Sequence, residues 1–134
     1  QADIAELRQD VVNFIRTTLA NNVVNLSGHV EKLAASKDRE FIVRFLTLML
    51  MWFRDAFVLL QGGTIINLDQ QDDLKKFTAK FGNADLQNVM DAVEHAISLI
   101  YKNGYIPLTL LQLAVKLRRA ILETPSQRLQ KTIA

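Results

Sequence analysis

Residues 38–61 constrain the fold more than any other segment, because they are apolar almost throughout yet carry charges inside the run (DREFIVRFLTLMLMWFRDAFVLLQ). A membrane-spanning helix needs about 20 predominantly apolar residues with few or no charges. Arg44, Arg54 and Asp55 would each add about 2.5–3.5 kcal/mol to the cost of insertion near the bilayer centre. We therefore expect that this segment does not span a membrane and that the chain has no membrane partner.

The same segment has a helical pattern when its residues are placed at about 100° intervals around a helix axis. The interruptions of its apolar character gather in one narrow stripe, which consists of Arg44, Thr47, Met51, Asp55 and Val58, with Arg54 and Gln61 at one edge. All other positions around the circumference are apolar. A helix with so narrow a polar face is typical of the centre of a water-soluble bundle.

Apolar residues recur at helical spacing in most of the remaining chain. This spacing predicts helices near residues 3–20, 23–36, 74–81 and 86–101, and a last helix from Pro107 to Glu123. The only β-like residues outside these segments are Ile65 and Ile66, which we interpret as a loop tucked into the core. We expect an all-α fold, a single compact bundle of about five to six helices over residues 1–123, followed by a short polar tail at 124–134.

Two places in this pattern are less regular. Gly28 lies inside the second helix, where glycine costs about 1 kcal/mol relative to alanine. Asp69, with Asp72 three residues later, resembles the capping box that begins a helix, although Glu or Gln is the usual second residue. We expect Arg54, Asp55 and Asp69 to be structural charges.

The composition excludes several classes of site. The chain has 134 residues, no cysteine and a net charge of +2, so disulfides and thiolate metal sites are absent and no strong field steers it to nucleic acid. The absence of cysteine and of a basic-then-apolar leader indicates a cytoplasmic protein. The first residue is Gln1 rather than Met, which suggests a piece of a longer chain.

No catalytic motif is present. The sequence contains no phosphate loop, no dinucleotide fingerprint and no nucleophile elbow. His95 has Asp91 one turn before it, which would suit a carboxylate-oriented acid/base pair, but an exposed surface pair is the more common meaning of this spacing. We therefore expect no catalytic residue, no cofactor, no metal and no small-molecule substrate, and hence no enzyme activity from this chain alone.

The last helix has an apolar arc wider than one bundle face needs, about 200°. The arc is formed by Leu110, Leu111, Leu113, Ala114, Val115, Leu117, Ile121 and Leu122. Arg118 falls inside it and needs a partner: a carboxylate such as Asp55 or Asp69, a carbonyl, or another chain. Alternatively, Arg118 reaches to water from the edge of the bundle. We predict a subunit interface that includes Leu111, Val115, Arg118 and Leu122.

Two patterns raise the question of nucleic-acid binding. Trp52 and Phe53 beside Arg54 could stack on bases, but they lie on the broad apolar arc, which favours core packing. Basic residues in the second half of the chain could contact phosphates, but acidic residues are interleaved with them. These residues are Lys75, Lys76, Lys80, Lys116, Arg118 and Arg119.

The order of these features resembles a known family. An apolar helix that contains Trp52-Phe53-Arg54-Asp55 is followed by Asn67-Leu68-Asp69, a small helix, a long amphipathic helix that ends near Asn103, and a Leu-rich helix from Leu110 to Arg118. This order is similar to the C-terminal collar domain of bacterial DNA polymerase III clamp-loader subunits, and most similar to the delta prime type, with the gamma/tau type next. The similarity covers nearly the whole chain and is most specific from Phe45 to Arg119.

The resemblance implies a helical domain that joins similar domains of other clamp-loader subunits in a heteropentamer. It implies that separate modules bind ATP, the sliding clamp and primed DNA, so that this chain meets DNA only indirectly through the complex. A rival interpretation is the ligand-binding and dimerisation domain of a helical transcription regulator, which needs a cavity between its helices. The sequence upstream of Gln1 would separate the two, because one predicts an ATPase-like module and the other a helix-turn-helix.

Overall fold

The computed structural model describes residues 4–20, 22–35, 38–65 and 68–123, and these ranges contain six α-helices and one short 3-10 helix. The elements are α1 (Ile4–Leu19), α2 (Val23–Ala34), α3 (Arg39–Leu60), η1 (Leu68–Gln70), α4 (Gln71–Lys80), α5 (Leu86–Tyr101) and α6 (Ile106–Leu122). No strand occurs in the described ranges, and the prediction of an all-α bundle of five to six helices is confirmed. The predicted tail at 124–134 lies outside the described residues.

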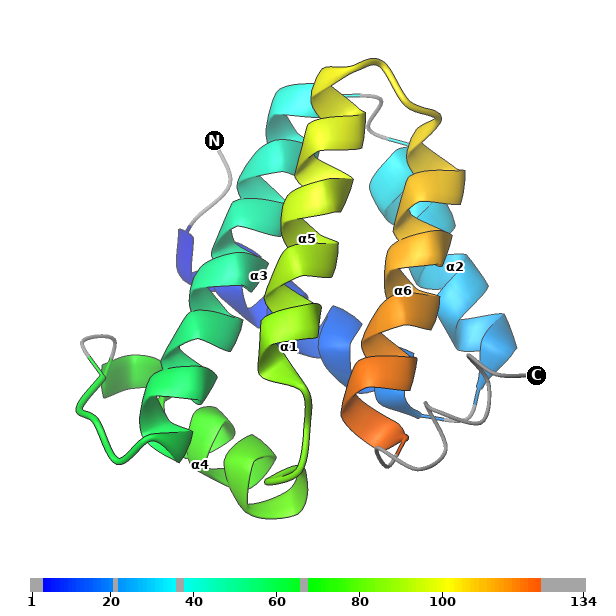
Figure 1. The fold of residues 1–134 in the computed structure, drawn as a ribbon. Coiled ribbons are helices and arrows are strands. Elements are labelled where there is room, and N and C mark those ends of the chain that lie inside the picture. Colours follow the sequence, from blue (N-terminus) through cyan, green and yellow to red (C-terminus); the bar gives the residue numbers. More distant parts are fainter. Residues whose placement is uncertain (1–3, 21, 36–37, 66–67, 124–134) are drawn as a thin grey trace.

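Three helices stand side by side in the layer nearest the viewer in Figure 1. In this layer α5 lies between α3 and α6, packs against both, and runs in the opposite direction. Helix α1 crosses behind the layer and contacts α3 and α6, while α2 packs against α1 and α6. Helix α4 closes one end of the bundle against α3. This arrangement places one continuous apolar core between the layers.

Helix α3 lies where its apolar pattern predicts. It begins at the N-cap Asp38, whose side chain accepts a hydrogen bond from the Phe41 backbone N–H at 3.3 Å, and it ends before Gly62, which has a φ of +81°. Its buried side chains are Ile42, Phe45, Leu46, Met49, Trp52, Phe53 and Ala56. Because these side chains meet α1, α4 and α5, the predicted central position of this helix is confirmed.

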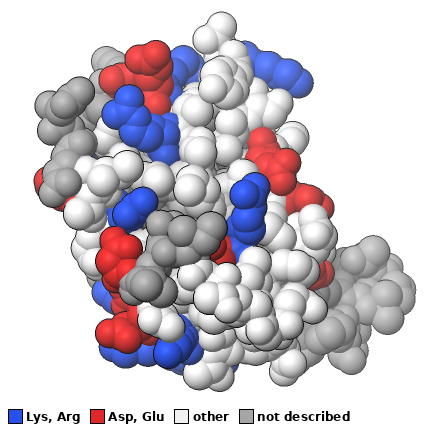
Figure 2. Space-filling view, turned by 90° about the vertical axis from the view of Figure 1, so that its left-hand side faces the viewer, with Lys and Arg blue, Asp and Glu red and all other residues white. Residues whose placement is uncertain are grey.

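The exposed stripe of α3 differs in detail from the predicted one. Arg44, Thr47, Met51 and Arg54 are exposed as expected, whereas Asp55 is half-buried. The stripe is also wider near its end, where Phe57 and Leu60 are partly exposed. Figure 2 shows the side of the molecule that lies at the left of Figure 1, and charges of both signs are interspersed on it without a field of one sign. Within the described ranges, no helix combines the length and apolarity needed to cross a bilayer.

The segment between α3 and α5 corrects one detail of the predicted pattern. Ile65 is buried, as expected for a loop residue tucked into the core, and Ile66 lies outside the described residues. The predicted capping box of Asp69 and Asp72 is wrong: η1 takes up Leu68–Gln70, and α4 begins after Gln70 without a side-chain cap. The physical reason is a distant partner, because the Asp69 carboxylate pairs with Arg8 of α1 at 3.3 Å.

Helix α2 is continuous through Gly28. Its N-cap Asn22 accepts a hydrogen bond from the Asn25 backbone N–H at 3.0 Å, and this cap offsets part of the cost of the glycine. Only Val30 and Leu33 of this helix are buried. Helix α2 is therefore attached to the bundle by a narrower apolar face than α3.

Lowering the pH through the range just below 6.5 is expected to destabilise the fold through His29. This side chain is half-buried with its ring edge against Phe14, at a centroid distance of 5.4 Å. Burial lowers the pKa of His29 below 6.5; Asp10 opposes this shift, and Lys32 adds to it. Because the folded protein holds the proton less tightly than the unfolded chain, His29 contributes stability above pH 6.5 that is lost as the pH falls toward its lowered pKa.

Urea denaturation followed by circular dichroism on both sides of pH 6.5 measures this effect. The variant His29→Gln should lose less stability than the wild type between the two pH values. The exposed residue His95 offers a matched control for the chemical change from histidine to glutamine. An unchanged pH dependence in His29→Gln would contradict the assignment.

Candidate subunit interface

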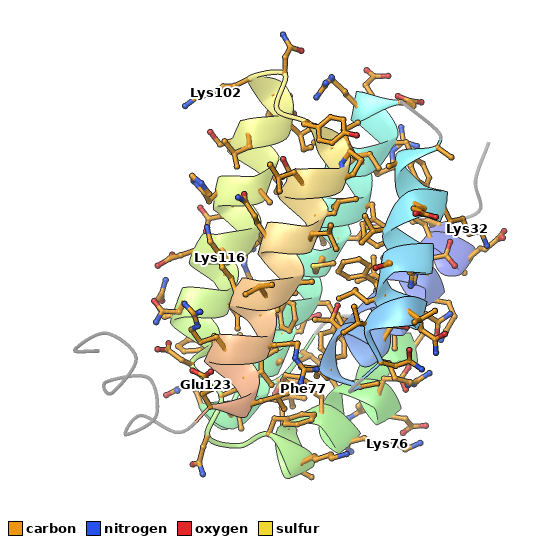
Figure 3. The ribbon with its side chains drawn as sticks, turned by 90° about the vertical axis from the view of Figure 1, so that its right-hand side faces the viewer. Lys32, Lys76, Phe77, Lys102, Lys116 and Glu123 are labelled. Carbon is orange, nitrogen blue, oxygen red and sulfur yellow. The ribbon has the colours of Figure 1, made fainter. Side chains whose placement is uncertain are left out.

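Helix α6 is packed on one face and open on the other. Its first turn contains Pro107, whose missing N–H costs nothing at this position. The side chains that pack against α1, α2 and α5 are Ile106, Thr109, Leu110, Leu113, Ala114, Leu117, Ala120 and Ile121. In Figure 3, α6 faces the viewer between α5 and α2, and Lys116 projects from it on the α5 side. The wide apolar arc predicted from the sequence is thus only partly used by the bundle.

The unused part of that arc forms a row of exposed apolar side chains. The row, called here the α6 apolar stripe, consists of Leu108 (52% exposed), Leu111 (36%), Val115 (55%) and Leu122 (39%). Spacings of three, four and seven residues place these side chains on one side of the helix. Single exposed leucines are common on protein surfaces, but a row of them is typical of a contact site. Of the four residues predicted for the interface, Leu111, Val115 and Leu122 lie in this row.

Leu108, Tyr101 and Tyr105 were not among the residues predicted for the interface. Leu108 continues the stripe toward the start of α6, and the spacing of three residues before Leu111 was the signal for it. The two tyrosines flank the corner between α5 and α6, and each is 72% exposed. Tyrosine is enriched in protein interfaces. Leu108 and Tyr105 therefore extend the exposed apolar surface at the start of α6 beyond the predicted residues, whereas Tyr101 lines a groove with residues of α3.

Arg118, the fourth predicted interface residue, has partners within the chain. Its side chain is half-buried, and its Nη1 donates hydrogen bonds to the carbonyl oxygens of Thr18 at 2.7 Å and Ala20 at 3.0 Å. These carbonyls lie at the end of α1, where the last backbone acceptors have no partner inside the helix. The cation also complements the negative end of the α1 dipole. The partners of Arg118 are carbonyls rather than the carboxylates of Asp55 or Asp69.

The predicted structural charges lie in three different settings. Arg54 is exposed on α3, and Asp69 pairs with Arg8. Asp55 is half-buried, and within the described part of the chain its buried Oδ2 accepts no hydrogen bond. The structure therefore does not bring these charges together into one cluster.

The burial of the remaining candidate residues decides between their functional and structural interpretations. His95 and Asp91 are both exposed, as expected for surface residues, and Asp91 accepts a hydrogen bond from Gln87 Nε2 at 3.2 Å. Trp52 and Phe53 are buried, which confirms core packing over a base-stacking platform. Among the residues with described positions, no three His, Asp or Glu side chains form a group that could hold a metal ion.

Comparisons with protein families, with curated proteins and with solved structures find no match for this chain. The functional argument therefore depends on the order of sequence features and on the geometry of α6. The feature that stands out in that geometry is the α6 apolar stripe, because it lies next to a well-packed bundle that does not use it.

Proposed function

We propose that this chain is the collar-type assembly domain of a bacterial DNA polymerase III clamp-loader subunit of the delta prime type. In this proposal it holds its subunit to the neighbouring subunits of a heteropentamer that loads the sliding clamp during DNA replication. The observation that carries the proposal is the α6 apolar stripe of Leu108, Leu111, Val115 and Leu122.

The physical support comes from what such a stripe does in water. An apolar row left exposed by a folded bundle gains free energy when a second apolar surface covers it, at about 25 cal/mol per Å². Tyr105, the exposed residue just before α6, has the amphipathic character common at subunit contacts. A domain with these features is suited to holding a neighbour.

The support for this particular family comes from the sequence. The run Trp52-Phe53-Arg54-Asp55 lies on the central helix, and the small helix, long amphipathic helix and Leu-rich helix follow in the expected order as α4, α5 and α6. In the proposed complex, other modules and subunits bind ATP, the clamp and DNA. The role of this chain is assembly.

Replacing Leu111 with aspartate is expected to abolish co-purification with partner clamp-loader subunits. A carboxylate placed in the centre of an apolar contact should weaken association by at least about 2 kcal/mol, the size of a hot-spot effect. Leu111 is partly exposed, so the isolated domain should keep its helical circular dichroism spectrum. Pull-down from mixtures with purified delta and gamma/tau partner subunits measures the association.

Gln112→Asp is the matched control for this experiment. It introduces the same charge on the same helix, one residue along, at an exposed position on the polar side of α6. The control should assemble like the wild type. Sedimentation with partner subunits should likewise show a complex for Gln112→Asp and none for Leu111→Asp. Normal assembly of Leu111→Asp would reject the stripe as the subunit contact.

A further inference from the structure

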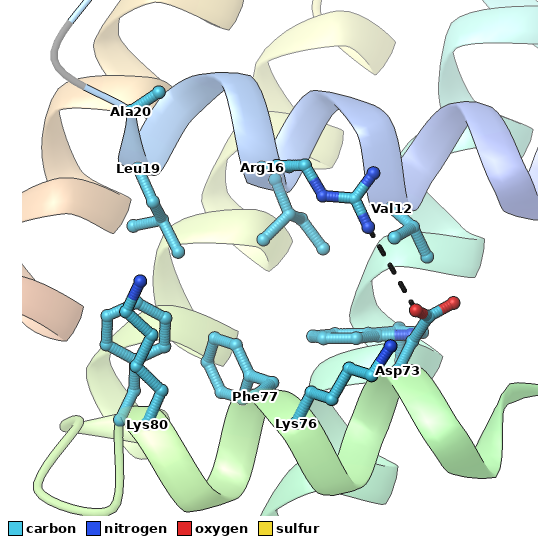
Figure 4. Close-up of a pocket in the computed structure, with 11 residues that line it drawn as sticks. Val12, Arg16, Leu19, Ala20, Asp73, Lys76, Phe77 and Lys80 are labelled. Atoms are coloured by element: carbon cyan, nitrogen blue, oxygen red, sulfur yellow. Dashed lines mark ion pairs between the residues drawn. The ribbon is translucent and has the colours of Figure 1, made fainter.

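A groove of about 340 Å³ lies between α1 and α4, on elements that the α6 apolar stripe does not use. Figure 4 shows it in close-up, with α1 above and α4 below. Its floor is aromatic, formed by Trp52 of α3, by Phe77 of α4 and by Phe81, the residue after α4. The ring centroids are 5.1 Å apart for Trp52 and Phe77, and 5.2 Å apart for Phe77 and Phe81. We call this feature the α1–α4 groove.

The floor contains a hydrogen-bond donor without an acceptor. Trp52 is 3% exposed, and within the described part of the chain its buried Nε1 makes no hydrogen bond. A buried indole N–H usually finds a partner, because leaving it unpaired forfeits the hydrogen bond it makes to water. Because this nitrogen is buried, a ligand oxygen would supply the missing acceptor only if the Trp52 ring turned toward the groove.

The rim of the groove is positively charged. Arg16 from α1 and Lys76 and Lys80 from α4 provide three cations, against the single carboxylate of Asp73. Arg16 and Asp73 reach toward each other in Figure 4, but their ion pair is long, at 4.0 Å, and the Arg16 side chain is 66% exposed. Lys76 and Lys80 lie one turn apart on α4 and are both exposed. The rim therefore has cations available for an anionic ligand.

We propose that the α1–α4 groove binds an acidic peptide segment of a partner protein. A bulky apolar side chain of the segment packs over the aromatic floor, mainly on the partly exposed ring of Phe81, and its carboxylates meet Arg16, Lys76 and Lys80. The volume is near the lower end of the range of about 300–1,000 Å³ typical of ligand pockets, which suits one or two side chains of a longer segment.

The charge of the groove argues against an occupant from this chain. Residues 124–134 carry Arg128 and Lys131 and no acidic side chain, so they have the same sign as the rim. A partner segment with several carboxylates has the complementary sign, and its association should weaken as salt screens the charges. The proposal is independent of the proposed assembly function, because α6 takes no part in the groove.

The experiment uses the intrinsic fluorescence of the full chain. Trp52 is the sole tryptophan, so its emission reports directly on the floor of the groove. The probe is a short capped peptide in which Leu-Phe is flanked on both sides by Asp-Asp. We expect a saturable change in emission that weakens with added salt. A peptide with Lys in place of Asp, and one with Ala in place of Leu and Phe, should each bind at least about tenfold more weakly.

Two charge-reversal pairs locate the binding. Lys76→Glu with Lys80→Glu should weaken binding of the acidic peptide at least about tenfold. Lys102→Glu with Lys116→Glu changes the net charge equally at exposed positions away from the groove, and should bind like the wild type. Figure 3 shows Lys102 at the opposite end of the bundle from Lys76. Circular dichroism checks that both variants are folded.

Several results would overturn the proposal. Equal weakening by both charge-reversal pairs would show that the peptide responds only to net charge. If citrate changes Trp52 emission and binds with the same affinity as the acidic peptide, the groove is a site for small anions. If single-stranded DNA binds more tightly than the peptide and depends on the same lysines, the groove is a site for nucleic acid. A chain that ends at Glu123 and gains peptide binding would assign the groove to residues 124–134. Absence of any emission change would reject the site.

Discussion

Replacing Phe45 with alanine is expected to lower the free energy of unfolding by about 3–5 kcal/mol. Phe45 has no exposed surface, and its ring lies edge-on to that of Phe14 at a centroid distance of 5.7 Å, which joins α3 to α1. The substitution removes this contact and leaves a cavity in the centre of the bundle. Because small domains are stable by only about 5–15 kcal/mol, the variant should lose a large share of its stability.

Phe57→Ala is the matched control, since it makes the same chemical change on the same helix. Phe57 is 36% exposed and lies at the wider end of the exposed stripe, so its replacement should cost about 1 kcal/mol or less. Urea denaturation of both variants, followed by circular dichroism, gives the two free energies. Equal losses of unfolding free energy in the two variants would mean that the face of α3 that carries Phe45 is not the one packed in the core.

The central position of α3 could be predicted because burial follows a local, periodic signal. Apolar residues at every third or fourth position indicate which face of a helix is buried, whatever that face packs against. The start of a helix is an equally local feature, because Asp38 and Asn22 each accept a hydrogen bond from the backbone N–H three residues ahead. Helix α5 begins in the same way at Asp85, whose side chain accepts a hydrogen bond from the Asn88 backbone N–H.

The contacts between distant elements could not be predicted from the periodic signal. Asp69 pairs with Arg8, 61 positions away, so its local capping pattern was misleading. The α1–α4 groove was missed for the same reason, because Arg16 comes from one end of the chain and Lys76 and Lys80 from the middle. The sequence instead grouped those lysines with Lys116, which lies on another helix.

Helix α6 falls between these two cases. The width of its apolar arc showed that more surface was apolar than one bundle face could cover, and this is what the structure contains. The sequence did not decide which edge of the arc would be buried, because Leu110 and Leu111 are equally apolar neighbours. Leu110 is fully buried and Leu111 is partly exposed because α1, α2 and α5 all lie on one side of the helix.

Replacing Arg118 with methionine is expected to lower the free energy of unfolding by about 1.5–3 kcal/mol, the usual contribution of hydrogen bonds to a charged group. Methionine keeps the unbranched apolar stem but cannot donate to the carbonyls of Thr18 and Ala20. The end of α1 then loses its cation and two of its hydrogen bonds. Urea denaturation of the isolated chain measures the change.

Lys116→Met is the matched control, because it removes one positive charge from an exposed position on the same helix. It should change stability by about 0.5 kcal/mol or less. Arg118→Lys should fall between the two, since an ammonium keeps the charge and can donate, but the shorter lysine side chain ends before the position of Nη1, which donates both hydrogen bonds.

This series also separates the two roles considered for Arg118. If Arg118 serves the fold of its own chain, Arg118→Met should lose stability, and co-purification with partner subunits should weaken only as far as unfolding removes competent chains. Leu111→Asp should show the opposite pattern, with stability retained and assembly lost. An Arg118→Met variant that is as stable as the wild type but fails to assemble would instead place the guanidinium in the subunit contact. Unchanged stability would mean that the hydrogen bonds to the carbonyls of Thr18 and Ala20 are not the main role of Arg118.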